Sequence, residues 1–232
     1  MFLETTRRFA PPRLAAEDVQ LALQLAQVSP GKLVADLGCG YGRHLRALEL
    51  AGYAGALGFD RSALLLGEAA REAPNAQLIR ADLRALPLHE GTLSAAFCFY
   101  SSMFLGSHDD ARAALAEAAR VLRPGGSLVL TTDNPRRLAR RPNAHFAEDV
   151  PGLGRVVEES SFDARLNIDT VTKTVSLSGE ELSAVFVIRY YPPDQLAALA
   201  LEAGLQLIRL EPDEPLTDQT PQLVALLERL EN

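Results

Sequence analysis

A short glycine-rich stretch holds the residues best suited to bind a ligand. In VADLGCGYGRH, residues 34–44, an apolar run carrying Asp36 is followed by glycines at every second position, Gly38, Gly40 and Gly42. Glycine suits tight turns and the close approach of backbone to a bound molecule. In α/β proteins the first turn from strand to helix is where such ligands bind. The stretch therefore predicts a turn whose backbone faces a ligand.

Acidic residues follow three successive apolar runs. Asp36 ends the first run, Asp60 the second and Asp82 the third. The carboxyl ends of parallel strands meet at one edge of a sheet, so these carboxylates are expected to lie together. A carboxylate at Asp60 can accept both hydroxyls of a ribose. Three carboxylates attract a cation and repel a pyrophosphate, which predicts a positively charged nucleoside derivative as the ligand.

Arg43 argues against a dinucleotide. The dinucleotide fingerprint places glycine or alanine three positions after its second glycine, so that helix and strand pack closely. Arg43 occupies that position here. An NAD-dependent oxidoreductase is therefore the less favoured alternative.

The elements that position these residues alternate between strand and helix. Apolar runs predict strands at 32–38, 54–60, 76–82, 92–100 and 127–133, and amphipathic or capped stretches predict helices at 17–28, 42–52, 61–74 and 109–122. Strands that are apolar throughout, alternating with helices, indicate a parallel sheet covered on both faces. We predict a single α/β domain, residues 1–232, with a doubly wound, mostly parallel, Rossmann-like sheet whose cofactor-binding half is 30–134.

The pattern changes after residue 133. Residues 134–146 read as a loop rich in arginine, and residues 154–191 as an antiparallel β meander of three strands. We expect 135–192 to form an inserted lid over a substrate or a dimer interface. Residues 193–232 should complete the sheet with a helix, a strand at 205–211 and a last element that is either strand or helix, with strand favoured.

Composition limits the possible partners. The 232 residues are 47% hydrophobic and carry a formal net charge of −7, which argues against nucleic acid and anionic membranes. The cysteines, Cys39 and Cys98, form no disulfide framework and no metal-ligand spacing, so no metal is expected. No stretch has the length and apolarity of a membrane span or signal peptide. We expect a cytoplasmic monomer or homodimer.

Several stretches together resemble the class I S-adenosylmethionine-dependent methyltransferases. They are VADLGCGYGRH, LGFDRS, RADLRALPL and EAARVLRPGGSLVLTT, and they follow the family's order over residues 30–134. RYYPPDQLAALALEAGL resembles a later segment of the small-molecule branch. The resemblance implies S-adenosyl-L-methionine as cofactor and S-adenosyl-L-homocysteine as product.

The resemblance also implies a set of cofactor contacts. Asp36 would lie near the amino group of the methionine part and Asp60 would hold the ribose hydroxyls, while Asp82 and the backbone of Leu83 would meet the adenine. The other implied contacts are Gly38, Cys39, Gly40 and Gly42 under the methionine part, Arg61 beside Asp60, and Cys98 and Phe99 near the sulfonium. Ser94 stands where the family usually has an acid, a mild departure.

The acceptor side is less well defined by the sequence. Methyl transfer from a sulfonium is an in-line displacement that depends on positioning, so no general base is obligatory. We expect transfer to an O or N atom of a small molecule, with an anionic group if the arginines clamp it. Candidate substrate contacts are Tyr100, Ser101, Ser102, Arg140, Arg141 and Tyr190; weak catalytic candidates are Tyr100, His145 and Tyr190.

Other assignments stay open at this point. A non-catalytic cofactor-binding protein of the same fold is one, and an RNA or protein methyltransferase is another. The motif Asn-Pro-Pro-Tyr is absent after the fourth strand, which counts against adenine and amide acceptors. His44 is expected to pack in the core, and residues 1–9 to cover the cofactor.

Overall fold

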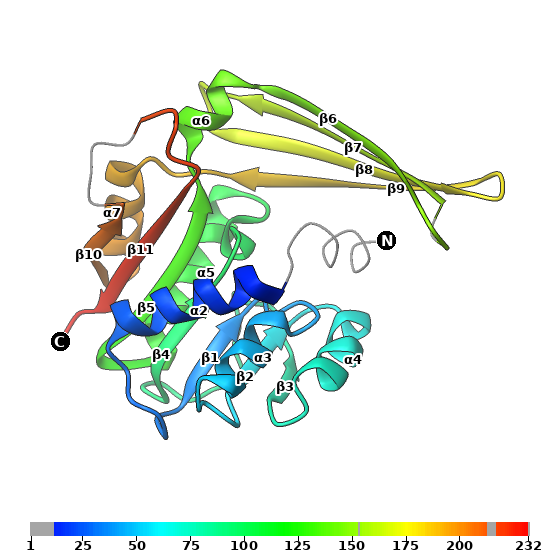
Figure 1. Cartoon of the computed structure of the whole chain (residues 1–232). Coiled ribbons are helices and arrows are strands. Elements are labelled where there is room, and N and C mark those ends of the chain that lie inside the picture. Colours follow the sequence, from blue (N-terminus) through cyan, green and yellow to red (C-terminus); the bar gives the residue numbers. More distant parts are fainter. Residues whose placement is uncertain (1–11, 153, 213–216, 232) are drawn as a thin grey trace.

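The computed structural model of the chain describes residues 12–152, 154–212 and 217–231, which form a large sheet between helices with a second sheet above it (Figure 1). The helices are α2 (Pro12–Ala26), α3 (Arg43–Leu50), α4 (Ala63–Glu72), η1 (Ser102–Phe104), α5 (His108–Val121), α6 (Pro135–Arg140) and α7 (Pro193–Glu202). The large sheet contains β1 (Val34–Leu37), β2 (Leu57–Asp60), β3 (Gln77–Arg80), β4 (Leu93–Cys98), β5 (Leu122–Asp133), β10 (Leu205–Glu211) and β11 (Gln222–Arg229). The second sheet, called the inserted sheet below, contains β6 (Asn143–Val150), β7 (Gly154–Asp163), β8 (Ile168–Leu177) and β9 (Glu180–Arg189).

The large sheet is doubly wound. Its strand order is β10-β11-β5-β4-β1-β2-β3, and β1 to β5 are parallel while β11 runs antiparallel to both β5 and β10. The chain passes from β1 outward to β3 and then returns to β4 on the other side of β1. The order therefore reverses between β1 and β4, where ligands of such sheets bind. The predicted fold class is confirmed, and the last element is the favoured strand.

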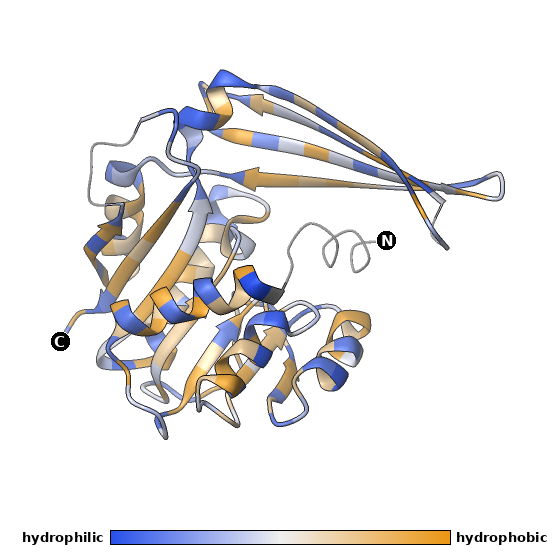
Figure 2. Cartoon of the chain, viewed as in Figure 1, coloured by the Kyte–Doolittle hydropathy of each residue, from blue (hydrophilic) through white to orange (hydrophobic). Residues whose placement is uncertain are grey.

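Helices cover both faces of this sheet. Val19 of α2, Leu45 of α3 and Leu66 of α4 belong to the core on one face. Leu115 of α5 and Leu196 of α7 belong to the core on the other. Figure 2 shows why the strands lie inside: the strands of the large sheet are mostly hydrophobic, whereas hydrophobic and polar residues alternate along the inserted strands. Within the described ranges, no helix is long and apolar enough to cross a lipid bilayer.

The inserted sheet lies above the carboxyl edge of the large sheet (Figure 1). Its order is β6-β7-β8-β9, an antiparallel meander joined to β5 through α6. The end of β9 also bonds to the segment after η1, because the N–H of Gly106 donates to the carbonyl of Val187 at 2.8 Å and Leu105 bridges Ile188. The inserted sheet is thus attached at more than its two chain ends.

The loop predicted at 134–146 is wrong, because this stretch forms α6 and the start of β6. The side chain of Asn134 accepts a hydrogen bond from the N–H of Arg136 and Pro135 occupies the first turn, which together start a short helix. All eight residues of β6 pair with β7, from Gly154 to Ser161, so this pairing rather than strong strand propensity holds β6 in place. The meander accordingly has one more strand than predicted. Most predicted boundaries differ by one to three residues, and two starts differ by five: α2 begins at residue 12 instead of 17, and β5 at 122 instead of 127.

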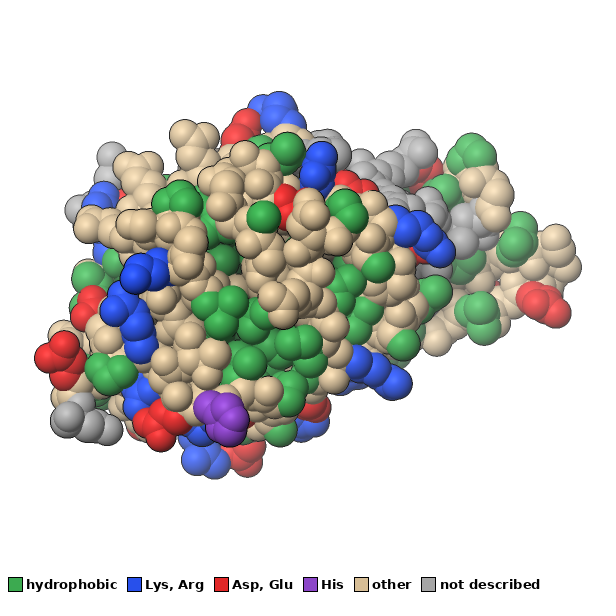
Figure 3. Space-filling view, turned by 90° about the horizontal axis from the view of Figure 1, so that it is seen from below, with side chains coloured by type: hydrophobic (Ala, Val, Ile, Leu, Met, Phe, Trp, Pro, Cys, Tyr) green, Lys and Arg blue, Asp and Glu red, His purple; other side chains and the backbone are tan. Residues whose placement is uncertain are grey.

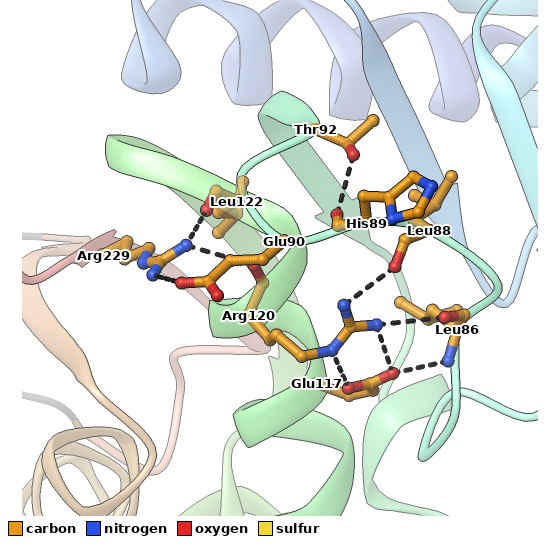
Figure 4. A network of polar contacts seen from close by, with 9 residues as sticks. All are labelled: Leu86, Leu88, His89, Glu90, Thr92, Glu117, Arg120, Leu122 and Arg229. Carbon is orange, nitrogen blue, oxygen red and sulfur yellow. Dashed lines mark hydrogen bonds and ion pairs between the residues drawn. The ribbon is translucent and has the colours of Figure 1, made fainter.

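A polar network holds the opposite, amino edge (Figure 4). At the end of α5, Arg120 donates to the carbonyls of Leu88 and Leu86 at 2.8 and 3.0 Å and pairs with Glu117. Arg229 of β11 donates to the carbonyl of Arg120 at 3.1 Å. The network joins a loop, a helix end and a strand. Seen from below (Figure 3), this face shows hydrophobic side chains near its middle and charges of both signs around its margin.

Candidate cofactor and acceptor site

The glycine turn after β1 has an open surface at one glycine and a crowded one at another. Gly40 has φ +55°, and a Cβ added there would meet no atom within 4 Å. Gly42 has φ +90°, and a Cβ there would lie 2.9 Å from Cα of Ala69 in α4. Gly42 therefore lets α3 and α4 pack, whereas Gly40 leaves space over the turn for something bound.

Asp36 is a buried carboxylate of which one oxygen lacks a partner among the described residues. It is 1% exposed, and its Oδ2 makes no hydrogen bond to any residue in the described ranges. Burial raises the pKa of Asp36 from 3.8 to about 7, with Arg43 lowering it and Asp60 raising it. An unsatisfied buried acceptor is costly, so this position is suited to a donor brought by a ligand. The amino group of a bound methionine moiety is such a donor.

Asp60 connects the glycine turn to the start of α4. Its Oδ2 accepts a hydrogen bond from the N–H of Gly40 at 2.9 Å, and its Oδ1 accepts one from the N–H of Ser62 at 2.8 Å. Each carboxylate oxygen has a second lone pair available, so these bonds leave capacity for hydroxyl donors. Arg61 is exposed, and its carbonyl accepts from Nε of Arg80 at 3.0 Å.

Asp82 lies on the same edge but is already engaged. The guanidinium of Arg84 donates to Asp82 at 2.8 and 2.6 Å and also pairs with Asp110. These bonds lower the pKa of Asp82 to about 2. Leu83 lies near the turn, since its Cδ1 would be 3.9 Å from a Cβ at Gly38. The three predicted acids thus share one edge, with Asp82 partly exposed and paired.

The chain after β4 is held in a strained conformation beside the turn. Tyr100 and Ser101 have φ +57° and +59°, which side-chain-bearing residues rarely adopt. The N–H of Tyr100 donates to Oγ1 of Thr131 at 2.8 Å, and Oγ of Ser101 donates to Oγ1 of Thr132 at 3.0 Å. Ser102 donates to the carbonyl of Phe99 at 3.0 Å. Cys98 and Phe99 are buried before this bend.

A cluster that the sequence did not reveal borders this bend. The ring of His44 stacks on Phe99 with centroids 4.0 Å apart. Asp18 of α2 receives two contacts on one Oδ2 oxygen, from Nε2 of His44 at 3.1 Å and from the hydroxyl of Tyr100 at 3.0 Å. Burial lowers the pKa of His44 to about 4, so the ring is neutral at pH 7. Spacing alone could not pair a residue of α2 with one after β4.

Arg43 belongs to the same cluster. Its Cζ lies 4.5 Å from the centroid of the Tyr100 ring, a cation–π contact. The guanidinium therefore does not fill the space over Gly40. The long side chain that disfavours a dinucleotide here packs on the ring of Tyr100.

The remaining predicted residues are dispersed. Tyr190 is 5% exposed and packs edge-to-face on Phe162, with ring centroids 6.2 Å apart. His145 is exposed and lies opposite Glu159, away from the face of the inserted sheet that buries Val156. Arg140 and Arg141 are exposed, and Arg140 pairs with Asp218 at 2.9 Å. The expected cover formed by residues 1–9 lies outside the described residues.

Two surface hollows lie away from the glycine turn. One of about 340 Å³ lies between α2 and the β10–β11 pair, where Leu25 and Ile208 are part of its lining. The other, of about 310 Å³, borders α7 and includes His108, Tyr190 and Tyr191. His108 contacts the hydroxyl of Tyr191 at 3.1 Å through Nδ1. Neither hollow contains a predicted cofactor residue.

Comparisons with known proteins agree with this geometry. Residues 34–126 match the family model of a methyltransferase domain. An uncharacterized 37.1 kDa protein in transposon TN4556 of Streptomyces fradiae is 31% identical over 172 residues, 67% of this chain and 49% of that protein. The chain thus spans about half the length of this curated relative.

Solved structures share the fold over nearly the whole chain. An S-adenosylmethionine-dependent methyltransferase from Clostridium acetobutylicum has a TM-score of 0.79 at 14% identity, covering 99% of this chain and 98% of that one. SAM-bound CalS10, an amino pentose methyltransferase from Micromonospora echinaspora, has a TM-score of 0.68 at 19% identity, covering 99% and 97%. Residues 34–126 thus match a methyltransferase domain, and nearly the whole chain has the fold of S-adenosylmethionine-dependent methyltransferases.

Proposed function

We propose that this chain catalyses transfer of a methyl group from S-adenosyl-L-methionine to an O or N atom of a small molecule. The observation that carries the proposal is the open turn at Gly40 beside the unpartnered, buried Oδ2 of Asp36. A cationic amino acid moiety satisfies both features, because its chain needs the space and its ammonium supplies the missing donor. A pyrophosphate would meet two nearby carboxylates, Asp36 and Asp60, and be repelled.

We assign the other cofactor contacts to residues at the same, carboxyl edge of the large sheet. Asp60 holds the ribose hydroxyls with the lone pairs left by Gly40 and Ser62. Asp82 and the backbone of Leu83 bind the adenine edge. Cys98 and Phe99 line the reacting end, and the Gly38–Gly42 backbone with Cys39 lies under the methionine part.

The protein contributes positioning. A bound sulfonium supplies an already activated methyl group, so catalysis rests on holding the acceptor atom in line with it. Tyr100, Ser101 and Ser102 are fixed by bonds to β5 and to Phe99, and they form one side of the acceptor space. The inserted sheet forms the other side. CalS10, whose fold this chain shares, is named as an amino pentose methyltransferase, which supports a small-molecule acceptor.

Ligand binding to the full chain tests the proposal. S-adenosylhomocysteine and S-adenosylmethionine should raise the melting temperature and NAD should not, since only a ligand of the native state stabilises it. Asp60→Asn should abolish most of the shift. Asp109→Asn is the matched control, because its carboxylate is 82% exposed in α5. Stabilisation by NAD alone, or an unchanged shift in Asp60→Asn, would contradict the assignment.

A further inference from the structure

The hollow that borders α7, called the α7 hollow below, lies apart from the proposed cofactor and acceptor spaces. Its volume is about 310 Å³, and its lining comes from the end of β9, the start of α5, one face of α7 and the turn between β7 and β8. That volume suits a small molecule. None of the proposed cofactor contacts lines it, and neither do Tyr100, Ser101 and Ser102.

Arg189 brings a positive charge without a counterion to the α7 hollow. It is the last residue of β9, and its Nε is buried with no hydrogen-bond partner among the described residues. No carboxylate of those residues forms an ion pair with it, Glu202 of the same hollow included. A buried donor without an acceptor is costly, so this guanidinium is suited to an acceptor that a ligand brings.

A second donor stands beside Arg189 in the same lining. Nδ1 of His108 lies 3.1 Å from the hydroxyl of Tyr191, and Tyr191 packs edge-to-face on Phe104 with ring centroids 5.1 Å apart. Burial raises the pKa of Tyr191 and the nearby charge of Arg189 lowers it, so the phenol keeps its proton at neutral pH. When this phenol donates to Nδ1, the neutral ring of His108 carries its own proton on Nε2, where it can be donated to a ligand.

The remaining lining residues define the kind of ligand. Glu202, at the end of α7, is exposed, so water screens its carboxylate more than it screens the half-buried Arg189. Gln195 adds a neutral amide on the same face of α7, and the exposed side chain of Leu166 adds apolar surface. The α7 hollow therefore favours an anion that carries a short carbon skeleton.

We propose that the α7 hollow binds a small organic oxyanion, with a phosphate or carboxylate group held by Arg189 and His108 and its carbon skeleton against Leu166. Guanidinium binds both groups through two parallel hydrogen bonds. Binding turns the guanidinium so that Nε, which is shielded from water in the ligand-free protein, donates to the oxyanion together with one Nη. The site goes beyond the proposed function, because methyl transfer uses none of these residues.

The experiment titrates the full, nitrogen-15-labelled chain, saturated with S-adenosylhomocysteine, in a phosphate-free buffer of constant ionic strength. Four probes share one skeleton: glycerol 3-phosphate, glycerate, neutral glycerol and cationic 3-amino-1,2-propanediol. We expect at least one of the two oxyanions to bind and to shift the Nε–H signal of Arg189, and which of them binds more tightly identifies the preferred group. Glycerol and the amine should not bind.

Substitutions assign the binding to this lining. Arg189→Gln should weaken oxyanion binding about 10- to 100-fold, the effect of a lost charged hydrogen bond, and His108→Ala about threefold to tenfold. Arg189→Lys keeps the charge but not the planar fork and should lose less than Arg189→Gln. Glu202→Gln should strengthen binding about two- to threefold, because it removes an exposed like charge.

The matched control is Arg165→Gln, which removes the same charge from an exposed position next to Leu166 but outside the lining. It should bind the oxyanion as the wild type does. The proposal is overturned if neither oxyanion binds, if glycerol or the amine binds equally well, or if Arg165→Gln loses as much affinity as Arg189→Gln. Where circular dichroism shows that Arg189→Gln does not fold, unchanged affinity in both Arg189→Lys and His108→Ala overturns it instead.

Discussion

Replacing Asp36 with asparagine should make the free protein more stable and the cofactor complex weaker. Folding raises the pKa of this carboxyl from 3.8 to about 7, which is about three pH units. Each unit corresponds to about 1.4 kcal/mol, so keeping Asp36 ionised in the folded, ligand-free protein costs about 4 kcal/mol at pH 8.

The sign of the pH dependence follows from the direction of this shift. Below pH 3.8 the carboxyl is protonated in both states and contributes nothing. Between 3.8 and 7 the unfolded chain loses the proton and the folded one retains it, so the free energy of unfolding falls as pH rises. Asparagine does not titrate. The stability of Asp36→Asn relative to wild type should therefore increase by about 3 kcal/mol between pH 5 and pH 8.

Cofactor binding should change in the opposite direction. A ligand ammonium pairs with the ionised form of Asp36, so wild-type affinity for S-adenosylhomocysteine should fall by up to about tenfold per pH unit below pH 7. In Asp36→Asn the affinity should be weak and lack this dependence.

Urea denaturation followed by circular dichroism and calorimetry at four pH values would measure both effects. Asp109→Asn, with its exposed carboxylate, serves as the control. If the stability difference between Asp36→Asn and wild type does not vary with pH, the carboxyl is not the buried, unpaired group described here. If the variant binds S-adenosylhomocysteine normally, the ammonium is placed wrongly.

Three further predictions concern separate parts of the fold. Gly42→Ala should lower the free energy of unfolding by about 2–4 kcal/mol, because its Cβ meets Ala69. Gly40→Ala should lower it by about 1–2 kcal/mol and mainly weaken S-adenosylhomocysteine binding. Urea titrations with and without ligand distinguish the two variants, and equal losses of stability would contradict the reasoning. Asp60→Ala should weaken S-adenosylhomocysteine binding about 100-fold, measured by calorimetry, and a change below about threefold would refute the ribose assignment. Arg120→Met should lower the free energy of unfolding by about 2–3 kcal/mol, because it leaves the carbonyls of Leu86 and Leu88 without their donor, and it should leave S-adenosylhomocysteine affinity unchanged. Lost affinity at normal stability would show that this polar network acts on the cofactor site.

The part of the molecule that could be predicted is the part that local sequence encodes. The glycine turn, the acids after β1 to β3 and the alternation of elements are contiguous patterns, and the fold class followed from them. Asp36, Asp60 and Asp82 lie on one edge because parallel strands must end together. Their roles as ligand contacts stay predictions.

What could not be predicted depends on packing between distant segments. Asp18 meets His44 and Tyr100 only because α2 lies against α3. Asp169 lies among threonines on a strand whose register with β7 places it inward beside Ser160, and no periodicity marks it. The arginines at 140 and 141 stood out by composition, yet a short helix leaves them exposed.

The hydrogen bond from Gly106 to Val187 joins the inserted sheet to the segment after η1, and so joins the two proposed sides of the acceptor space. A tilt of the inserted sheet should displace the segment that carries the strained bend after β4. A shift of that bend should likewise displace the end of β9. We therefore expect the cofactor and the acceptor to bind cooperatively at the proposed site, which the affinity for one measured with and without the other would show.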